Sequence, residues 1–240
     1  MKVLPIHTGN FKLDGGAMFG VVPKVIWNKL VPANENNLCN WSMRCLLVEI
    51  EDRKILIDTG IGNKQSEKFY GHYDLNGEDS LMGSLASNGI SADQITDVLL
   101  THLHFDHCGG AIKWNKERTG FEPVFKNAIY WSTENHWKWA TEPNAREKAS
   151  FLPENILPIQ ASGQLKFIVR DGDFMEKVFP NMDVLFVDGH TESMMIPHIK
   201  YKEKTLVFMA DLLPSVGHIP LPYVMGYDTR PLITLKEKAS

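Results

Sequence analysis

The chain has 240 residues, of which 43% are hydrophobic, 22% charged and 10% aromatic. These are ordinary values for a globular protein, and they exclude a disordered, collagen-like or coiled-coil chain. Its 25 basic and 29 acidic residues give a formal net charge of −4. This charge argues against nucleic acid or an anionic membrane as a partner, because both are bound through a basic surface. No linker or repeat divides the chain, so we expect a single domain over residues 1–240.

Neither a secretory leader nor a membrane helix is predicted. The N-terminus reaches Thr8, Gly9 and Asn10 before any apolar segment forms, unlike a signal peptide. No apolar run approaches the ~20 residues that span a bilayer. The three cysteines contain no C-x-x-C pair, and so few thiols fit a reducing compartment better than a disulfide framework. We therefore expect a cytoplasmic protein.

The first half of the chain is predicted to be rich in strands, and the first two of them form a β-hairpin around a polar turn. The predicted strands cover residues 44–50, 54–58, 97–101 and 128–131. Ser91 is placed to cap a short helix, and Ser132 or Thr133 opens another that runs to about residue 140.

The second half adds three short apolar strands, at residues 184–187, 194–198 and 205–209. Prolines and a glycine interrupt residues 139–163, which we interpret as a surface excursion or, alternatively, as an active-site lid. Residues 230–240 resemble the beginning of a helix. Short strands at this spacing predict stacked sheets whose outer faces must be covered by helices, so the fold class is α/β or α+β, built in layers.

The strongest chemical signal is the segment THLHFDH at residues 101–107. His102 and His104 are two residues apart, so in extended backbone they point the same way and can share one metal ion. The chain then turns, and Asp106 and His107 at the start of a helix can reach a second ion. This pattern favours a metal centre over three buried structural histidines.

Three further residues gain weight from their positions at the ends of apolar strands. His190 lies in the segment DGHT, directly after one apolar strand, and Asp211 lies in the segment MAD, at the end of another. An ionised carboxylate in such a place needs compensation, which a metal ion would supply, so we expect both residues to be ligands. Asp58 in LIDTG is predicted to hold a ligand or loop from behind, with an Asx-type turn as the alternative.

The segments LIDTG, THLHFDH, DGHT and MAD, in this order and spacing, resemble the metallo-β-lactamase superfamily of hydrolases from about Met43 to Asp211. The resemblance implies a four-layer αββα sandwich with the site at one edge of its two sheets. It also implies a first metal held by His102, His104 and His190, a second held by Asp106 and His107, and Asp211 bridging both.

The N-terminal segment at 13–27 is similar to a narrower branch, related to acyl-homoserine lactonases and methyl parathion hydrolase. That branch has a last histidine well downstream of the bridging aspartate, whereas only His218 follows Asp211 here. Either His218 lies at the site as an additional ligand, or the chain lacks a natural C-terminal segment and holds its second metal weakly without that segment. Pro214 replaces a tyrosine of the lactonases, which argues against a specific lactonase activity.

We therefore expect two divalent metal ions, with zinc favoured by imidazole and carboxylate ligands without thiolates, and with manganese or iron as open alternatives. Such a pair lowers the pKa of a shared water from 15.7 to roughly 7. The resulting metal-bound hydroxide would attack a small-molecule ester, lactone or phosphotriester, with Asp106 orienting the nucleophile or moving its proton. The sequence leaves a homodimer open.

Two alternatives remain. A glyoxalase II-like thioester hydrolase shares these ligands but needs basic groups for the carboxylates of glutathione, and the sequence contains no basic cluster. A non-catalytic metal-binding or interaction module with an incomplete second site is the alternative from another class. Apolar residues near the motifs are expected to line a substrate pocket or else to belong to the core: Met18, Phe19, Met194, Met195, Tyr223 and Met225.

Overall fold

The structure is a computed structural model that describes residues 1–240. Its larger sheet has six strands in the spatial order β1-β2-β3-β4-β7-β8, of which β1, β2 and β3 are antiparallel and the others join in parallel. The strands are β1 (Lys2–Asp14), β2 (Leu38–Ile50), β3 (Arg53–Ile57), β4 (Asp97–Leu99), β7 (Ile129–Ser132) and β8 (Leu165–Phe167). The predicted hairpin is confirmed as β2 and β3, which pair through Leu46 and Ile57.

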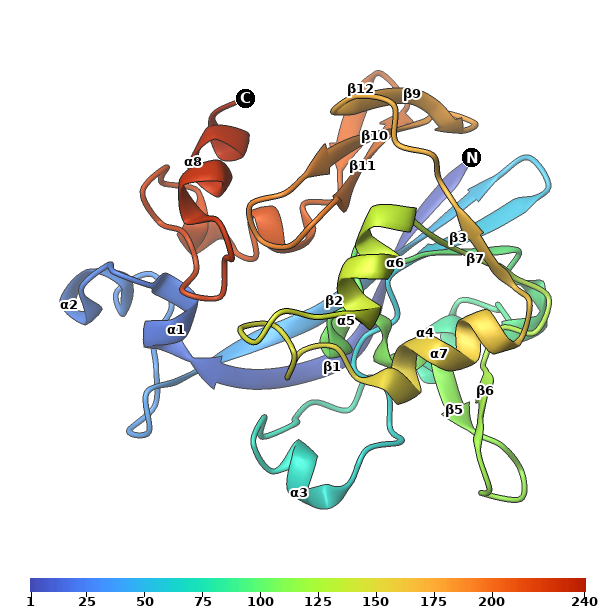
Figure 1. Cartoon of the computed structure of the whole chain (residues 1–240), viewed down its shortest axis with the longest axis horizontal. Helices are drawn as coiled ribbons and strands as arrows, with labels where there is room; N and C mark the ends of the chain where they lie inside the picture. The colour runs from blue at the N-terminus through green and yellow to red at the C-terminus, as the bar shows by residue number, and fades with distance from the viewer.

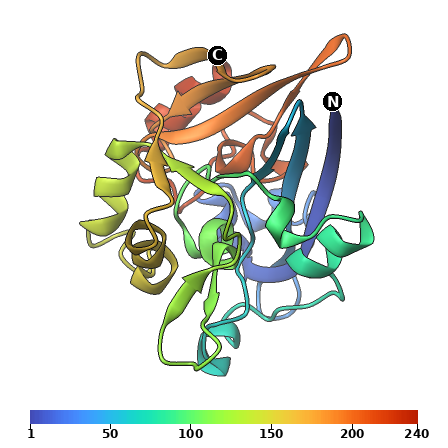
Figure 2. The same ribbon diagram turned by 90° about the vertical axis from the view of Figure 1, so that its right-hand side faces the viewer.

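A second sheet of four antiparallel strands lies against the first, in the order β12-β11-β10-β9 (Figures 1 and 2). Its strands are β9 (Phe174–Phe179), β10 (Met182–Val187), β11 (Met194–Tyr201) and β12 (Lys204–Val207). The three strands predicted in this half of the chain are confirmed as β10, β11 and β12. A small separate ribbon consists of β5 (Ile112–Trp114) and β6 (Phe121–Pro123).

The core is divided by the two sheets into layers. Between the sheets, Val48 and Ile57 pack against Phe186 and Met195. The other face of the larger sheet is covered by α4 (Leu81–Ser87), α6 (Glu134–Thr141) and α7 (Pro153–Ala161), which bury Leu85, Trp137 and Ile156. On the far side of the second sheet lie η3 (Ala210–Leu212) and α8 (Pro231–Ala239). The predicted layered α/β class is confirmed.

Local signals explain several element boundaries. Thr133 caps α6, since its hydroxyl accepts a hydrogen bond from the His136 amide at 3.1 Å. Ser91 precedes the short helix η1, and its amide donates to the Gln94 side chain at 2.8 Å. The remaining helical segments are α1 (Gly15–Phe19), α2 (Lys24–Trp27), α3 (Glu67–Tyr70), α5 (Phe105–Cys108), η1 (Ala92–Gln94), η2 (Gly109–Ala111) and η4 (Val216–His218). No helix is long and apolar enough to cross a bilayer.

One region differs from its prediction. Residues 139–163 are not merely a surface excursion, because they contain α7, whose Ile156 and Ile159 are buried against the larger sheet. Pro158 lies inside this helix, where it removes one backbone hydrogen bond without ending the helix because the packing of the apolar face compensates. The irregular part is confined to the residues before Pro153, and several of them face the site described next.

Candidate metal centre

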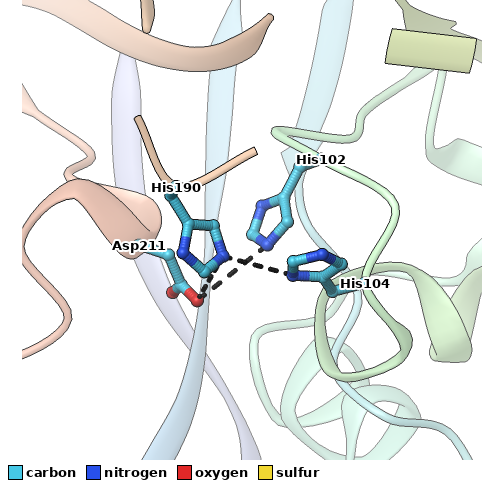
Figure 3. Close-up of side chains that lie close together, drawn as sticks. All are labelled: His102, His104, His190 and Asp211. Atoms are coloured by element: carbon cyan, nitrogen blue, oxygen red, sulfur yellow. Dashed lines mark hydrogen bonds and ion pairs between the residues drawn. The ribbon is translucent and has the colours of Figure 1, made fainter. Parts of the chain in front are cut away.

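Side chains from both sheets converge at one edge of the sandwich. His102 and His104 follow β4, and Asp106 and His107 lie in α5. His190 follows β10 in the second sheet, and Asp211 lies in η3 after β12. Figure 3 shows His102 and His104 facing His190 and Asp211. The structure thus brings together all six residues that the sequence singled out as ligands.

Four donor atoms form the tightest group. Nδ1 of His104 lies 3.2 Å from Nε2 of His190, which lies 3.3 Å from Oδ2 of Asp211. Nε2 of His102 is 3.9 Å from the same oxygen. All four ligand atoms lie within 4.8 Å of one another, and the buried Nε2 of His102 has no hydrogen-bond partner.

A second group shares Asp211 with the first. Its other oxygen, Oδ1, lies 3.2 Å from Nε2 of His107, and that nitrogen is 3.6 Å from Oδ2 of Asp106. The aspartate therefore presents one oxygen to each group, an arrangement suited to bridging two cations.

The outward-facing nitrogen of each histidine has an oxygen partner, which fixes the tautomer and leaves the inward-facing nitrogen free to bind a metal. These pairs are His102 with the Thr101 hydroxyl at 3.1 Å, His104 with Glu147 at 3.3 Å, His107 with Asp58 at 2.8 Å, and His190 with Asp228 at 3.0 Å.

Asp58 lies behind His107, where the sequence predicted it. Its carboxylate also accepts hydrogen bonds from the amide and the hydroxyl of Thr101, both at 2.8 Å. The side chain is 1% exposed, and its backbone φ of 58° places the residue in the left-handed region that aspartate tolerates better than most residues. One carboxylate thus ties the loop after β3 to both halves of the THLHFDH segment.

Sequence reasoning missed three partners of the cluster: Glu147, Asp228 and His136. His136 holds the backbone between His102 and His104, since its Nε2 accepts a hydrogen bond from the Leu103 amide at 2.8 Å. Its Nδ1 donates to the carbonyl of Glu192 at 2.5 Å, in the loop that carries His190. Glu147 and Asp228 lie in no motif or periodic segment, and His136 lies in the predicted helix after Thr133 with nothing to distinguish it from a core residue, so no local signal could have found them.

The charge around the cluster favours a cation. Burial, with a further contribution from the neighbouring His107, holds the pKa of His102 well below its usual value, so that imidazole is neutral and able to bind a metal. Burial also acts to lower the pKa of His107, but the carboxylates of Asp211, Asp106 and Asp58 outweigh it and raise that pKa well above its usual value. The same carboxylates would stabilise a bound metal ion.

Glu147 is a buried outer partner that accepts hydrogen bonds from three side chains. It is 3% exposed and accepts hydrogen bonds from Trp139 at 2.6 Å and Asn144 at 2.7 Å as well as from His104. Burial acts to raise its pKa, but hydrogen bonding, that from His104 first and that from Asn144 as well, lowers it to about 2.

Changing Glu147 to glutamine is expected to weaken the binding of added zinc, used as a probe of the cluster, about 10- to 100-fold, because an amide cannot accept from all three donors. Competition with a chromogenic chelator measures this affinity, and exposed Glu142→Gln is the matched control. Equal zinc affinity of the Glu147 variant and the wild type would show that the carboxylate does not orient His104.

The structure places His218 away from this centre. Its Nε2 donates to the Met18 carbonyl at 2.8 Å, its Nδ1 lies 2.8 Å from the Ser215 hydroxyl, and its ring stacks on Phe19 at 4.4 Å. Both ring nitrogens are therefore engaged, and the expectation that His218 is an additional ligand is wrong. A lone histidine gives no sign in the sequence of whether its partners will be backbone or metal.

A cleft of about 870 Å³ opens over the donor atoms. Of the apolar residues expected to line a pocket, Met18 and Met225 do so. Phe19, Met194 and Met195 are instead buried in the core, and Tyr223 packs beside Phe19, outside the lining. Aromatic walls come from residues that the sequence did not single out: Phe11, Trp41, Tyr73, Phe105 and Tyr227.

The family model described as the metallo-beta-lactamase superfamily matches residues 44–238. An N-acyl homoserine lactonase of Bacillus cereus is 26% identical over 190 residues, covering 75% of this chain and 66% of the lactonase. An N-acyl homoserine lactonase of Bacillus thuringiensis is 26% identical over 172 residues, covering 68% of this chain and 58% of the lactonase. The chain thus spans about two thirds or less of the length of these curated relatives.

Two solved structures illustrate the similarity in fold. A probable metal-dependent hydrolase from Staphylococcus aureus superimposes with a TM-score of 0.89 at 31% identity, covering 99% of this chain and 82% of the other. AidC, a dizinc quorum-quenching lactonase in complex with a product, gives a TM-score of 0.76 at 20% identity, covering 99% of this chain and 81% of the AidC chain. At that identity the second match shows the fold alone.

Proposed function

This chain belongs to the metallo-beta-lactamase superfamily, and from that premise we propose that it is a dinuclear zinc hydrolase of small-molecule esters, lactones or phosphotriesters. The proposal covers the reaction and the metal count. Zinc is favoured by the donor set of imidazoles and carboxylates and by the dizinc lactonase of the same fold. The substitution of proline at position 214 still argues against a dedicated lactonase.

The observation that supports a metal ion most strongly is that hydrogen-bond acceptor atoms face one another in the cluster. The outer partners direct the protons of His104 and His190 outward, so two nitrogen lone pairs face each other at 3.2 Å, with a carboxylate oxygen 3.3 Å from the second. Such a group repels itself unless a cation lies among its members. The buried Nε2 of His102, without a partner, completes the set. The residues therefore fit a metal ion, held by these three histidines and Asp211.

The second ion would be held by Asp106, His107 and the other oxygen of Asp211. When bound, the two ions supply Lewis acidity and lower the pKa of water toward neutrality. Asp106 lines the cleft, where it can orient the attacking water and take up its proton. The apolar and aromatic walls of the cleft hold the organic part of the substrate and exclude bulk water.

The first test is the metal content of the protein purified without added metal, measured by elemental analysis. We expect about two zinc ions per chain in the wild type and one or fewer in His104→Ala, which removes a ligand of the first ion. Exposed His72→Ala is the matched control and should keep both ions.

Two zinc ions in the wild type, lost in the ligand variant alone, would justify a screen of esters, lactones and phosphotriesters. One ion per chain would support a mononuclear hydrolase and contradict the dinuclear proposal. No metal in any form, even after reconstitution, would contradict the hydrolase and favour the binding module.

A further inference from the structure

The inner face of β2 changes character along the strand. Alternate residues of a strand point to the same face, and Leu46, Val48 and Ile50 pack in the core between the sheets. The same alternation continues to Arg44, which is exposed and lines the cleft over the donor atoms. Its backbone is fixed by pairing with His7 of β1. The backbone that carries this guanidinium is therefore part of a paired strand in the cleft wall rather than of a loose loop.

This guanidinium has no partner in the protein. Of the six arginines in the chain, Arg44 is the one that makes no hydrogen bond, ion pair or aromatic contact. The others are engaged: Arg53 with Asp97, Arg170 with Asp188, Arg230 with Glu192, Arg118 over the ring of Trp114, and Arg146 with the carbonyls of Gly226 and Asp228.

The acids of the cleft cannot neutralise this charge, because each of them faces a histidine of the metal centre. These acids are Asp58, Asp106, Glu147 and Asp211. The cleft also contains Arg146, which forms no ion pair and comes from a distant part of the chain. The sequence contained no basic cluster, but folding brings two arginines without carboxylate partners into one cleft. An anionic group is the ligand that such a wall can bind.

We propose that Arg44 determines specificity by binding a carboxylate on the substrate, so that the substrate is an ester or thioester whose acyl group ends in a carboxylate. The inference rests on the proposed hydrolase function and names its substrate class. The planar fork of donors on arginine matches a carboxylate with two parallel hydrogen bonds. This contact lies away from the reacting bond, so it contributes to binding of the substrate and of the transition state alike.

The test compares two 4-nitrophenyl esters of equal acyl length on the zinc-loaded enzyme. One is the monoester of glutaric acid, which carries a terminal carboxylate, and the other is the neutral pentanoate. We expect Arg44→Gln to raise KM for the glutarate ester about 10- to 100-fold with little change in kcat. For the neutral ester, kcat/KM should stay within about twofold. Arg44→Lys should give an intermediate loss, because it keeps the charge but not the fork.

Arg118→Gln, outside the cleft, is the matched control and should leave both esters unaffected. Calorimetry of glutarate and pentanoate binding gives a second measurement that needs no turnover, and Arg44→Gln should weaken only glutarate. Equal effects of the substitution on both esters, or unchanged glutarate binding, would overturn the proposal. If the wild type binds zinc and prefers glutarate but hydrolyses neither ester, the hydrolase function fails while the anion site stands.

Discussion

Replacing Asp211 by asparagine is expected to lower kcat/KM for any substrate by at least about 1,000-fold, roughly 4 kcal/mol of transition-state stabilisation. The reason is its double contact, with one oxygen 3.3 Å from His190 and the other 3.2 Å from His107. An amide nitrogen in place of either oxygen cannot bind a cation, so one of the two metal ions loses a ligand whichever way the side chain turns. Steady-state kinetics with saturating zinc measure the loss.

Asp171→Asn serves as the control, because that aspartate is exposed and lies outside the cleft. Zinc titration of both variants should separate the causes, since the Asp211 variant is expected to retain no more than one tightly bound ion. A variant with full activity and two tightly bound ions would show that Asp211 does not bridge the metals.

Changes at Asp58 are expected to separate stability from metal binding. Asp58→Ala leaves the Thr101 amide, its hydroxyl and His107 without their buried acceptor, so the free energy of unfolding should fall by about 2–4 kcal/mol. Asp58→Asn can still accept from the Thr101 amide, and its own amide group can donate to the outer nitrogen of His107. Its stability should therefore stay within about 1 kcal/mol of the wild type.

The asparagine variant should nevertheless bind the second metal about 10- to 100-fold more weakly. Donation to Nδ1 moves the proton of His107 to Nε2, the nitrogen that faces Asp106 and Asp211, and a protonated nitrogen cannot be a ligand. Urea unfolding of the metal-free proteins and chelator competition check the two halves of this prediction. An asparagine variant that binds both ions as tightly as the wild type would show that the carboxylate does not set the tautomer.

The ligand positions were predictable because each follows an apolar strand. Strands buried on both faces, such as β4 and β10, are visible as short apolar runs, and His102 and His190 stand where these runs end. Asp211 follows β12, which is visible as an apolar run although its residues are exposed or half-buried. The spacing within THLHFDH is local as well, so it needs no knowledge of the tertiary structure. The layered fold class followed from the same runs.

What the sequence could not predict depends on contacts between distant segments. Glu147 and Asp228 lie in loops without periodicity, and only the packing of those loops brings them to His104 and His190. Strand β1 was missed because its apolar residues do not alternate regularly and Pro5 interrupts them. Its place at the edge of the sheet tolerates a proline, which has no amide to donate.

The division of the donor atoms between the two sheets has a consequence for the folded lifetime of the protein. His102 and His104 follow a strand of the larger sheet and His190 follows a strand of the smaller one. An ion among them therefore joins two halves that otherwise meet through apolar packing and a few hydrogen bonds, such as that from the Met195 amide to the Thr101 carbonyl. Binding energy gained there is folding energy by linkage. If the proposed zinc ion binds there, removing it is expected to lower the free energy of unfolding and so to shorten the folded lifetime of the protein.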